Sequence, residues 1–436
     1  MGSDLVIGIF GVVLLFVLLA IRMPVAFTLT LISLIGIALV NGPKAVSHTF
    51  ANVPISGVAS YSWSVIPLFV LMGNLASESG IIEAGFRAFH KWLGHLRGGM
   101  AYAVIATCAV FAACTGSSVA SVGFLTKVAL PEMESRGYKS ILGTGAIASG
   151  STLGILIPPS IPFVVYGLLA EQSIGKLYMA GIIPGIILTG LFMLVIFCWA
   201  WFDPEAARGG PKAPLRERIA AISSVWPFLI IILAVLGTIW GGIATPVESA
   251  SLGVVATAIV SLVQRRLTLN GFMTAVKDTM VVTGMIGALL IGALLFTSFM
   301  AQTGLPAYLA DWTTKLSLSL NELLLIVFVF FFVGGCVMDS VALTLIGVPI
   351  LVPILNQMNF NLVLFGVFVV IMIEMALISP PFGMNVFIMG GIARHVPMER
   401  IFMGIIPFLV VIIVCLWLVI AFPQLALYLP TNMIAR

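Results

Sequence analysis

The sequence Gly154-Ile155-Leu156-Ile157-Pro158-Pro159-Ser160 places two adjacent prolines in an apolar stretch, and Ser379-Pro380-Pro381-Phe382-Gly383 repeats the arrangement. The second proline pair lies 222 residues after the first (380 − 158). Two adjacent prolines lack two backbone donors and clash with the preceding turn, so an α-helix cannot continue through them unbroken. Each stretch therefore predicts a discontinuous helix.

The same spacing recurs elsewhere in the chain. It relates Ser118-Val119-Ala120 to Ser340-Val341-Ala342, Pro24 to Pro246 and Pro131 to Pro353, and a shift of one more residue relates Gly181-Ile182-Ile183-Pro184 to Gly404-Ile405-Ile406-Pro407. Apolar sequences that repeat internally, with proline interruptions at matching places, are typical of membrane transporters. We therefore predict two structural repeats.

Composition indicates an all-α integral membrane protein. Apolar residues make up 61% of the chain and charged residues only 8%, whereas soluble domains are about one quarter charged. Several apolar runs approach the roughly 20 residues of a spanning helix. No long basic run accompanies the net charge of +4, so membrane lipid is an expected partner and nucleic acid is not.

The basic residues predict that the two repeats are inverted. Arg22 lies between the first two apolar segments, but the equivalent joint in the second copy, Ala244-Thr245, is uncharged and basic residues flank that pair of segments instead. Because basic loops prefer the cytoplasm, the two copies should insert in opposite directions. Both termini of this multi-pass membrane protein are then predicted to lie on the outer side, away from the cytoplasm.

Two re-entrant helical hairpins are expected, each followed by a discontinuous helix. The first has arms from Met100 to Cys114 and from the tip to Pro131, and the second has arms Leu323–Gly334 and Val341–Leu355. Short amphipathic helices, Ile82–Leu96 and Leu305–Lys315, should precede them. The predicted parts are first-repeat scaffold and interfacial arm (1–97), first-repeat transport part (98–202), cytoplasmic connector (203–223), second-repeat scaffold and arm (224–319) and second-repeat transport part (320–436).

The hairpin tips and the proline breaks are the candidate binding sites. Unwound backbone survives at membrane depth only where it is buried in protein or lines a cavity. Its carbonyl oxygens suit sodium, and the helix N-termini attract an anionic substrate group. The candidate sodium ligands are Thr115, Gly116, Ser117, Ser118 and Pro158 in the first half, and Gly335, Cys336, Met338, Asp339, Gly383 and Met384 in the second. The candidate substrate residues are Ser117, Thr152, Ser160, Ser340 and Asn385. Alternatively, these small and polar residues only cap helices and allow close packing.

Two acids lie within apolar sequence, which suggests function in a membrane protein. Asp339 begins a half-helix, where a capping role would also explain it. Glu374 lies within a span and is either a proton site or a buried structural partner, for example of Lys127. The chain lacks nucleotide-binding and hydrolase motifs, so it is not expected to be an enzyme. The four histidines are expected to be solvated.

These motifs together resemble the large membrane subunit of the tripartite ATP-independent periplasmic (TRAP) transporters, the DctM-like permeases of the ion transporter superfamily. The resemblance covers nearly the whole chain. It rests on Ala113-Cys114-Thr115-Gly116-Ser117-Ser118-Val119-Ala120, on residues 154–160, on Gly181-Ile182-Ile183-Pro184-Gly185 and on Ser379-Pro380-Pro381-Phe382-Gly383-Met384-Asn385.

The resemblance implies a multi-pass protein of the bacterial inner membrane with both termini in the periplasm. It further implies sodium-coupled uptake of an organic acid, such as a dicarboxylate or sialic acid, that a soluble periplasmic binding protein delivers. It also implies a separate small four-helix membrane subunit and an elevator mechanism, in which hairpins and broken helices slide as a block against the scaffold. The alternative is a stand-alone sodium- or proton-coupled carboxylate carrier that needs no binding protein. A membrane-embedded enzyme would be supported only by the serines at the first tip.

Overall fold

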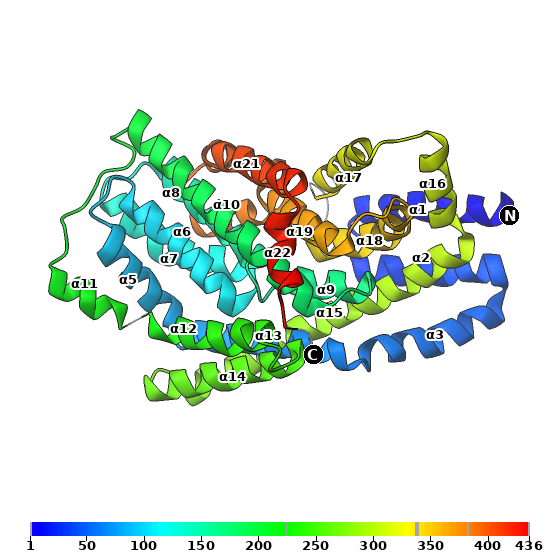
Figure 1. Ribbon diagram of the computed structural model, residues 1–436, viewed down its shortest axis with the longest axis horizontal. Helices are drawn as coiled ribbons and strands as arrows, with labels where there is room; N and C mark the ends of the chain where they lie inside the picture. Colours follow the sequence, from blue (N-terminus) through cyan, green and yellow to red (C-terminus); the bar gives the residue numbers. More distant parts are fainter. Residues whose placement is uncertain (1, 224, 336–339, 382, 435–436) are drawn as a thin grey trace.

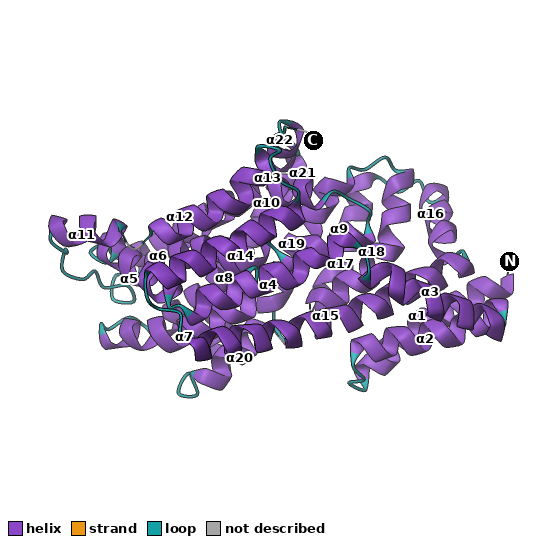
Figure 2. Cartoon of the chain, turned by 90° about the horizontal axis from the view of Figure 1, so that it is seen from below, coloured by secondary structure: helices purple, strands orange, loops and turns teal. Residues whose placement is uncertain are grey.

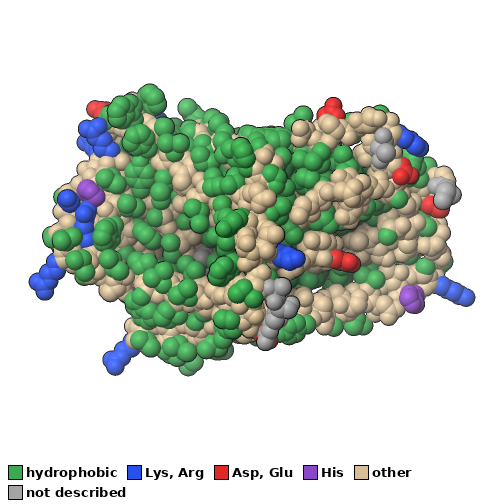
Figure 3. Space-filling view, in the orientation of Figure 1, with side chains coloured by type: hydrophobic (Ala, Val, Ile, Leu, Met, Phe, Trp, Pro, Cys, Tyr) green, Lys and Arg blue, Asp and Glu red, His purple; other side chains and the backbone are tan. Residues whose placement is uncertain are grey.

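The computed structural model describes residues 2–223, 225–335, 340–381 and 383–434, which form helices and no strand (Figures 1 and 2). Within these described residues, six helices are long and apolar enough to cross a membrane, or up to eight if each of two bent pairs counts as one span. Figure 3 shows a face covered largely by hydrophobic side chains, with most charged side chains at its margins. This distribution is that of a protein embedded in lipid.

The helices predicted to form the scaffold open each repeat. In the first repeat they are α1 (Gly2–Ala20), α2 (Val25–Asn41), α3 (Pro43–Val58), a 3-10 turn (Tyr61–Ser64) and α4 (Val65–Glu78). In the second they are α12 (Trp226–Ile232), a π-helical turn (Leu233–Gly237), α13 (Thr238–Trp240), α14 (Pro246–Val263) and α15 (Leu269–Thr303). The chain bends by 53° between α3 and the segment that contains α4, whereas α15 is one helix of 35 residues. The repeats are therefore not identical.

The amphipathic helices, hairpins and broken helices follow. In the first repeat they are α5 (Ile81–Leu93), α6 (Gly99–Thr115), α7 (Ser118–Ser135), α8 (Ser140–Leu156), α9 (Ile161–Leu169) and α10 (Ile174–Phe202). In the second they are α16 (Leu305–Lys315), α17 (Leu320–Gly335), α18 (Ser340–Gln357), α19 (Leu362–Ile378), α20 (Met384–Ile392), α21 (Met398–Ala421) and α22 (Gln424–Thr431). The halves are joined by residues 203–214 and α11 (Leu215–Ile222).

Both predicted helix breaks are present. Helix α8 ends at Leu156 and α9 continues at a bend of 41° after Pro158-Pro159. Helix α19 ends at Ile378, and α20 begins at Met384 after the second proline pair. The prediction that the second arm of the first hairpin ends at Pro131 is wrong, because α7 continues to Ser135. Pro131 lies in its last turns, where the helix loses only the one hydrogen bond that the proline cannot donate.

The two broken helices run in opposite directions, which confirms the inverted repeat. The hydroxyl of Tyr166, near the end of α9, donates to the carbonyl oxygen of Leu362, the first residue of α19, at 2.6 Å. At the opposite end, His395, which follows α20, lies 3.0 Å from Glu134, which is also bonded to Ser140 at the start of α8. Each break therefore lies between the two ends of the same bundle.

Helices α8 and α21 touch through their backbones. A Cβ atom added at Gly145 would lie 2.3 Å from the carbonyl oxygen of Gly404, and one added at Gly404 would lie 2.2 Å from that of Ile141. Only glycine permits this approach, as at close helix crossings in other membrane proteins. Gly404 belongs to the repeated motif, so part of that motif has a packing role.

Candidate functional site

The first hairpin tip lies directly on the first helix break. Gly116 ends α6 with a φ of +58°, and a Cβ added there would lie 2.5 Å from the carbonyl oxygen of Pro159. Behind the tip, a Cβ at Gly154 would lie 3.1 Å from the carbonyl oxygen of Ser117. The tip and the break predicted from sequence are thus brought together, and their main-chain oxygens lie close to one another.

The hydroxyl groups at this junction are engaged locally. Ser117 caps α7 by accepting a hydrogen bond from the Ala120 amide at 3.4 Å, and Ser160 donates to the carbonyl oxygen of Ile155. The hydroxyls of Thr115 and Thr152 donate to the carbonyl oxygens of Phe111 and Ser149 at 3.3 and 2.7 Å. The capping alternative thus holds for Ser117 but not for Ser160, which precedes α9 without capping it by its side chain. A hydroxyl that donates still has lone pairs to offer a ligand.

A cavity of about 320 Å³ lies between this tip and the predicted scaffold. Thr115, Ser117 and Ile161 line it from the hairpin and the start of α9. Its volume is in the range of small-molecule sites. Thr152 and Ser160, predicted to contact substrate, are buried and are not among its lining residues. The cavity lies between the two parts that the family resemblance implies move against each other.

Sequence reasoning missed the polar residues on the scaffold side of this cavity, which are Asn74 and Ser77 of α4 and Asp278 of α15. The Asn74 side-chain amide donates to the hydroxyl of Thr279 at 3.0 Å and so joins α4 to α15. For Asp278 no ion pair is found within the described part of the chain. A polar residue within an apolar helix is the signal that could have identified Asn74.

The second hairpin approaches the second broken helix in a related way. A Cβ at Gly335 would lie 2.1 Å from that of Ala376 on α19. Gly383 precedes α20 with a φ of +42°, and Met384 is partly exposed. The predicted ligands Cys336, Met338 and Asp339 lie outside the described residues, as does the side chain of Ser340.

Asn385 of α20 connects the second break to the first hairpin. Its side chain is fully buried, and its amide nitrogen donates to the Ser118 hydroxyl at 2.6 Å and to the Ala148 carbonyl oxygen at 3.3 Å. Its carbonyl oxygen has no hydrogen-bond partner among the described residues. Sequence reasoning selected Asn385 and Ser118 separately and did not foresee that they touch.

Glu374 is fully buried in α19, and neither carboxyl oxygen has a hydrogen-bond partner in the described residues. Lys127 is exposed and makes no ion pair with it. The suggestion that Lys127 is the structural partner of Glu374 is therefore wrong. Lys127 carries its charge on a long flexible chain that reaches solvent or headgroups at low cost.

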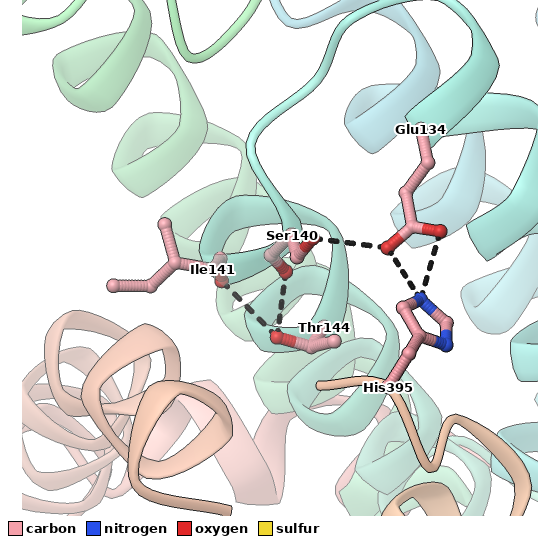
Figure 4. A network of polar contacts seen from close by, with 5 residues as sticks. All are labelled: Glu134, Ser140, Ile141, Thr144 and His395. Carbon is pink, nitrogen blue, oxygen red and sulfur yellow. Dashed lines mark hydrogen bonds and ion pairs between the residues drawn. The ribbon is translucent and has the colours of Figure 1, made fainter. Parts of the chain in front are cut away.

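The expectation that all histidines are solvated is wrong for His90, whose side chain is only 17% exposed, whereas His395 is exposed as expected although it contacts Glu134. Figure 4 shows His395 directed at the carboxylate of Glu134, with Ser140 bonded to the same carboxylate. His90 of α5 lies 3.4 Å from Glu132 of α7. Burial lowers the pKa of His90 from its usual value, and Glu132 partly opposes that shift. These contacts tie α5 and the loop after α20 to the base of the first hairpin.

Comparisons with known proteins agree with this geometry. A family model described as "Tripartite ATP-independent periplasmic transporter, DctM component" matches residues 12–425. The C4-dicarboxylate TRAP transporter large permease protein DctM of Pseudomonas aeruginosa is 33% identical over 85% of this chain and 86% of that protein. The sialic acid TRAP transporter large permease protein SiaM of Vibrio cholerae is 30% identical, over 94% and 95%.

A solved structure shows the same fold at low sequence identity. The YdaH transporter of Alcanivorax borkumensis has a TM-score of 0.63 and 15% identity, and the match covers 88% of this chain and 90% of that one. The matched relatives are transport proteins, which confirms that the chain is not an enzyme. The chain belongs to the DctM family, the large permease components of tripartite ATP-independent periplasmic transporters.

Proposed function

We propose that this permease carries out sodium-coupled uptake of a small organic acid across the bacterial inner membrane. A soluble periplasmic binding protein delivers the acid, a small four-helix membrane subunit enlarges the scaffold, and both termini lie in the periplasm. The observation that carries the proposal is the contact of the Gly116 tip with the carbonyl oxygen of Pro159, beside a cavity of about 320 Å³. Unwound backbone, close packing and a small-molecule space coincide there.

Sodium is the ion that this chemistry favours. The junction offers main-chain carbonyl oxygens and the hydroxyls of Thr115, Ser117 and Ser118. Neutral oxygen ligands suit a hard monovalent cation. No group of three or more histidine, cysteine or acidic residues that could hold a transition metal occurs among the described residues.

An elevator movement fits the way in which the cavity wall is divided. Asn74, Ser77 and Asp278 come from scaffold helices, whereas Thr115 and Ser117 belong to the hairpin. Sliding of the hairpin and broken helices would carry half of the site away from the other half. The short helices α5 and α16 lie where arms between fixed and moving parts are needed.

Substrate recognition rests on helix ends and neutral polar groups. Lysine and arginine are absent from the described cavity lining, and α9 begins at Ile161 on its wall. The N-terminus of α9 attracts the carboxylate of an organic acid. The matched relatives transport C4-dicarboxylates and sialic acid by name, so both acids are first choices as test substrates.

Reconstitution tests the proposal. Liposomes containing this chain, the candidate small subunit and a candidate binding protein should accumulate labelled acid under an inward sodium gradient and not under an equal choline gradient. Uptake that ignores sodium would overturn the coupling. Equal uptake without the binding protein would favour the stand-alone carrier.

A further inference from the structure

The clearest unexplained feature is a buried polar contact between the two repeats. Asn385 is the second residue of α20, just after the second break, and Ser118 is the first residue of α7, just after the first hairpin tip. They are 267 positions apart and joined by a hydrogen bond of 2.6 Å. One side chain thus links the two halves that hold the proposed sodium sites.

Not all polar atoms at this contact have a hydrogen-bond partner. The Asn385 carbonyl oxygen lacks a hydrogen-bond partner in the described residues, and so does the buried hydroxyl of Ser149, the neighbour of Ala148. A buried polar atom without a partner loses its hydrogen bonds to water and gains none in return, which destabilises the folded state. Such an atom in a native protein calls for an explanation, of which a missing ion or ligand is one. The contact is therefore suited to change when a ligand binds.

The backbone around the contact has little freedom to absorb a movement. Ser118 follows Gly116 and Ser117, and the Gly116 tip is already in contact with the Pro159 carbonyl oxygen. The Asn385 amide is also held by Ala148 of α8. A shift of the start of α20 therefore acts on both α8 and the first hairpin tip, because one amide group bonds to each of them.

We propose that Asn385 is a positioning residue that couples the proposed sodium sites of the two repeats. Sodium bound at the second break, beside Gly383 and Met384, fixes the position of the start of α20, and the Asn385 amide then holds Ser118 and the first tip in the geometry that binds sodium. The proposal rests on the sodium coupling proposed above. Its consequence is cooperative sodium binding, because two sites that bias one shared arrangement must favour each other's occupation.

Direct binding of sodium-22 to the purified full-length chain tests this inference. Equilibrium dialysis is carried out over a range of sodium concentrations, with choline keeping the ionic strength constant. We expect a Hill coefficient well above 1, up to about 2 for two sites. In Asn385→Ala it should fall to about 1 with sodium still bound, since the ligand groups of each half remain in place.

The matched control is Asn361→Ala. Asn361 also lies at a helix N-terminus of the second repeat, where its side chain accepts hydrogen bonds from the amides of Val363 and Leu364, far in sequence from both breaks. The substitution Asn361→Ala removes this helix cap and should leave the Hill coefficient unchanged. Asn385→Leu removes the same amide donor at nearly the same side-chain volume and leaves every proposed sodium ligand in place, so it replaces Asn385→Ala if that variant does not fold.

The outcomes separate this inference from the proposed function. Wild-type protein that binds no sodium would overturn the sodium coupling itself, and the inference with it. Wild-type protein that binds sodium with a Hill coefficient of 1 would overturn only the inference. Cooperativity that survives both Asn385→Ala and Asn385→Leu, or that is lost equally in Asn361→Ala, would also overturn it.

Discussion

Gly116→Ala is the sharpest test of the contact between the first tip and the first break. The added Cβ would lie 2.5 Å from the Pro159 carbonyl oxygen, whereas ordinary contact begins at 3.4 Å, so the tip must retreat by about 0.9 Å (3.4 − 2.5). At a φ of +58°, any residue with a side chain destabilises the folded state by about 1–2 kcal/mol relative to glycine. A displacement of about 1 Å at a site that positions reactants can lower the rate about 100-fold.

We therefore expect sodium-driven uptake by Gly116→Ala to fall by about 100-fold. Stability should fall by at least about 1–2 kcal/mol from backbone conformation alone. The assays are initial uptake rate in proteoliposomes and thermal unfolding of the purified chain.

Gly123→Ala is the matched control for this substitution. It makes the same change in α7 at a position where the new Cβ meets nothing within 4 Å. Alanine within a helix stabilises by about 0.5–1 kcal/mol relative to glycine, so uptake should be unchanged. Wild-type uptake by Gly116→Ala, or an equal defect in Gly123→Ala, would refute the role assigned to this contact.

Three further substitutions test other parts of the structure. Glu374→Gln should leave the free energy of unfolding within about 1 kcal/mol of wild type, because no described group pairs with the buried carboxyl. Breaking a buried ion pair would cost about 3–5 kcal/mol, so a loss of that size in thermal unfolding would show that a charged partner exists. Asp278 should repel an acidic substrate in the cavity, and two unit charges about 4 Å apart in water interact by about 1 kcal/mol, so Asp278→Asn should lower the KM by up to about fivefold. A raised KM in the uptake assay would contradict this repulsion. His395→Ala removes the exposed contact with Glu134 and should lower the free energy of unfolding by less than about 1 kcal/mol at low salt and by nothing at high salt. A loss of several kcal/mol that does not depend on salt would rule out a surface interaction.

Features that depend on local chemistry could be predicted from the sequence. The proline pairs define both breaks because proline cannot donate the hydrogen bond that a continuous helix needs. The inversion followed from basic residues near Arg22 and Arg265, because loop charge reports the side of the membrane. Neither inference required knowledge of which helices touch.

Features that depend on helix packing could not be predicted in this way. Asn74 and Asp278 line the cavity only because α4 packs against α15, and the contact between Asn385 and Ser118 joins opposite halves of the chain. The bend between α3 and α4 has no counterpart in α15 and follows no proline pair. These relations depend on side chains distant in sequence, which apolar periodicity does not specify.

The backbone contact between α8 and α21 limits how the two repeats can rearrange. Where Gly145 meets Gly404 there is no layer of side chains that could change rotamer and so let one helix slip along the other. Close-packed backbones resist small displacements. In the elevator movement proposed above, α8 of the first repeat and α21 of the second would therefore travel the same distance. A distance probe placed on each should report a constant separation while both move relative to α15.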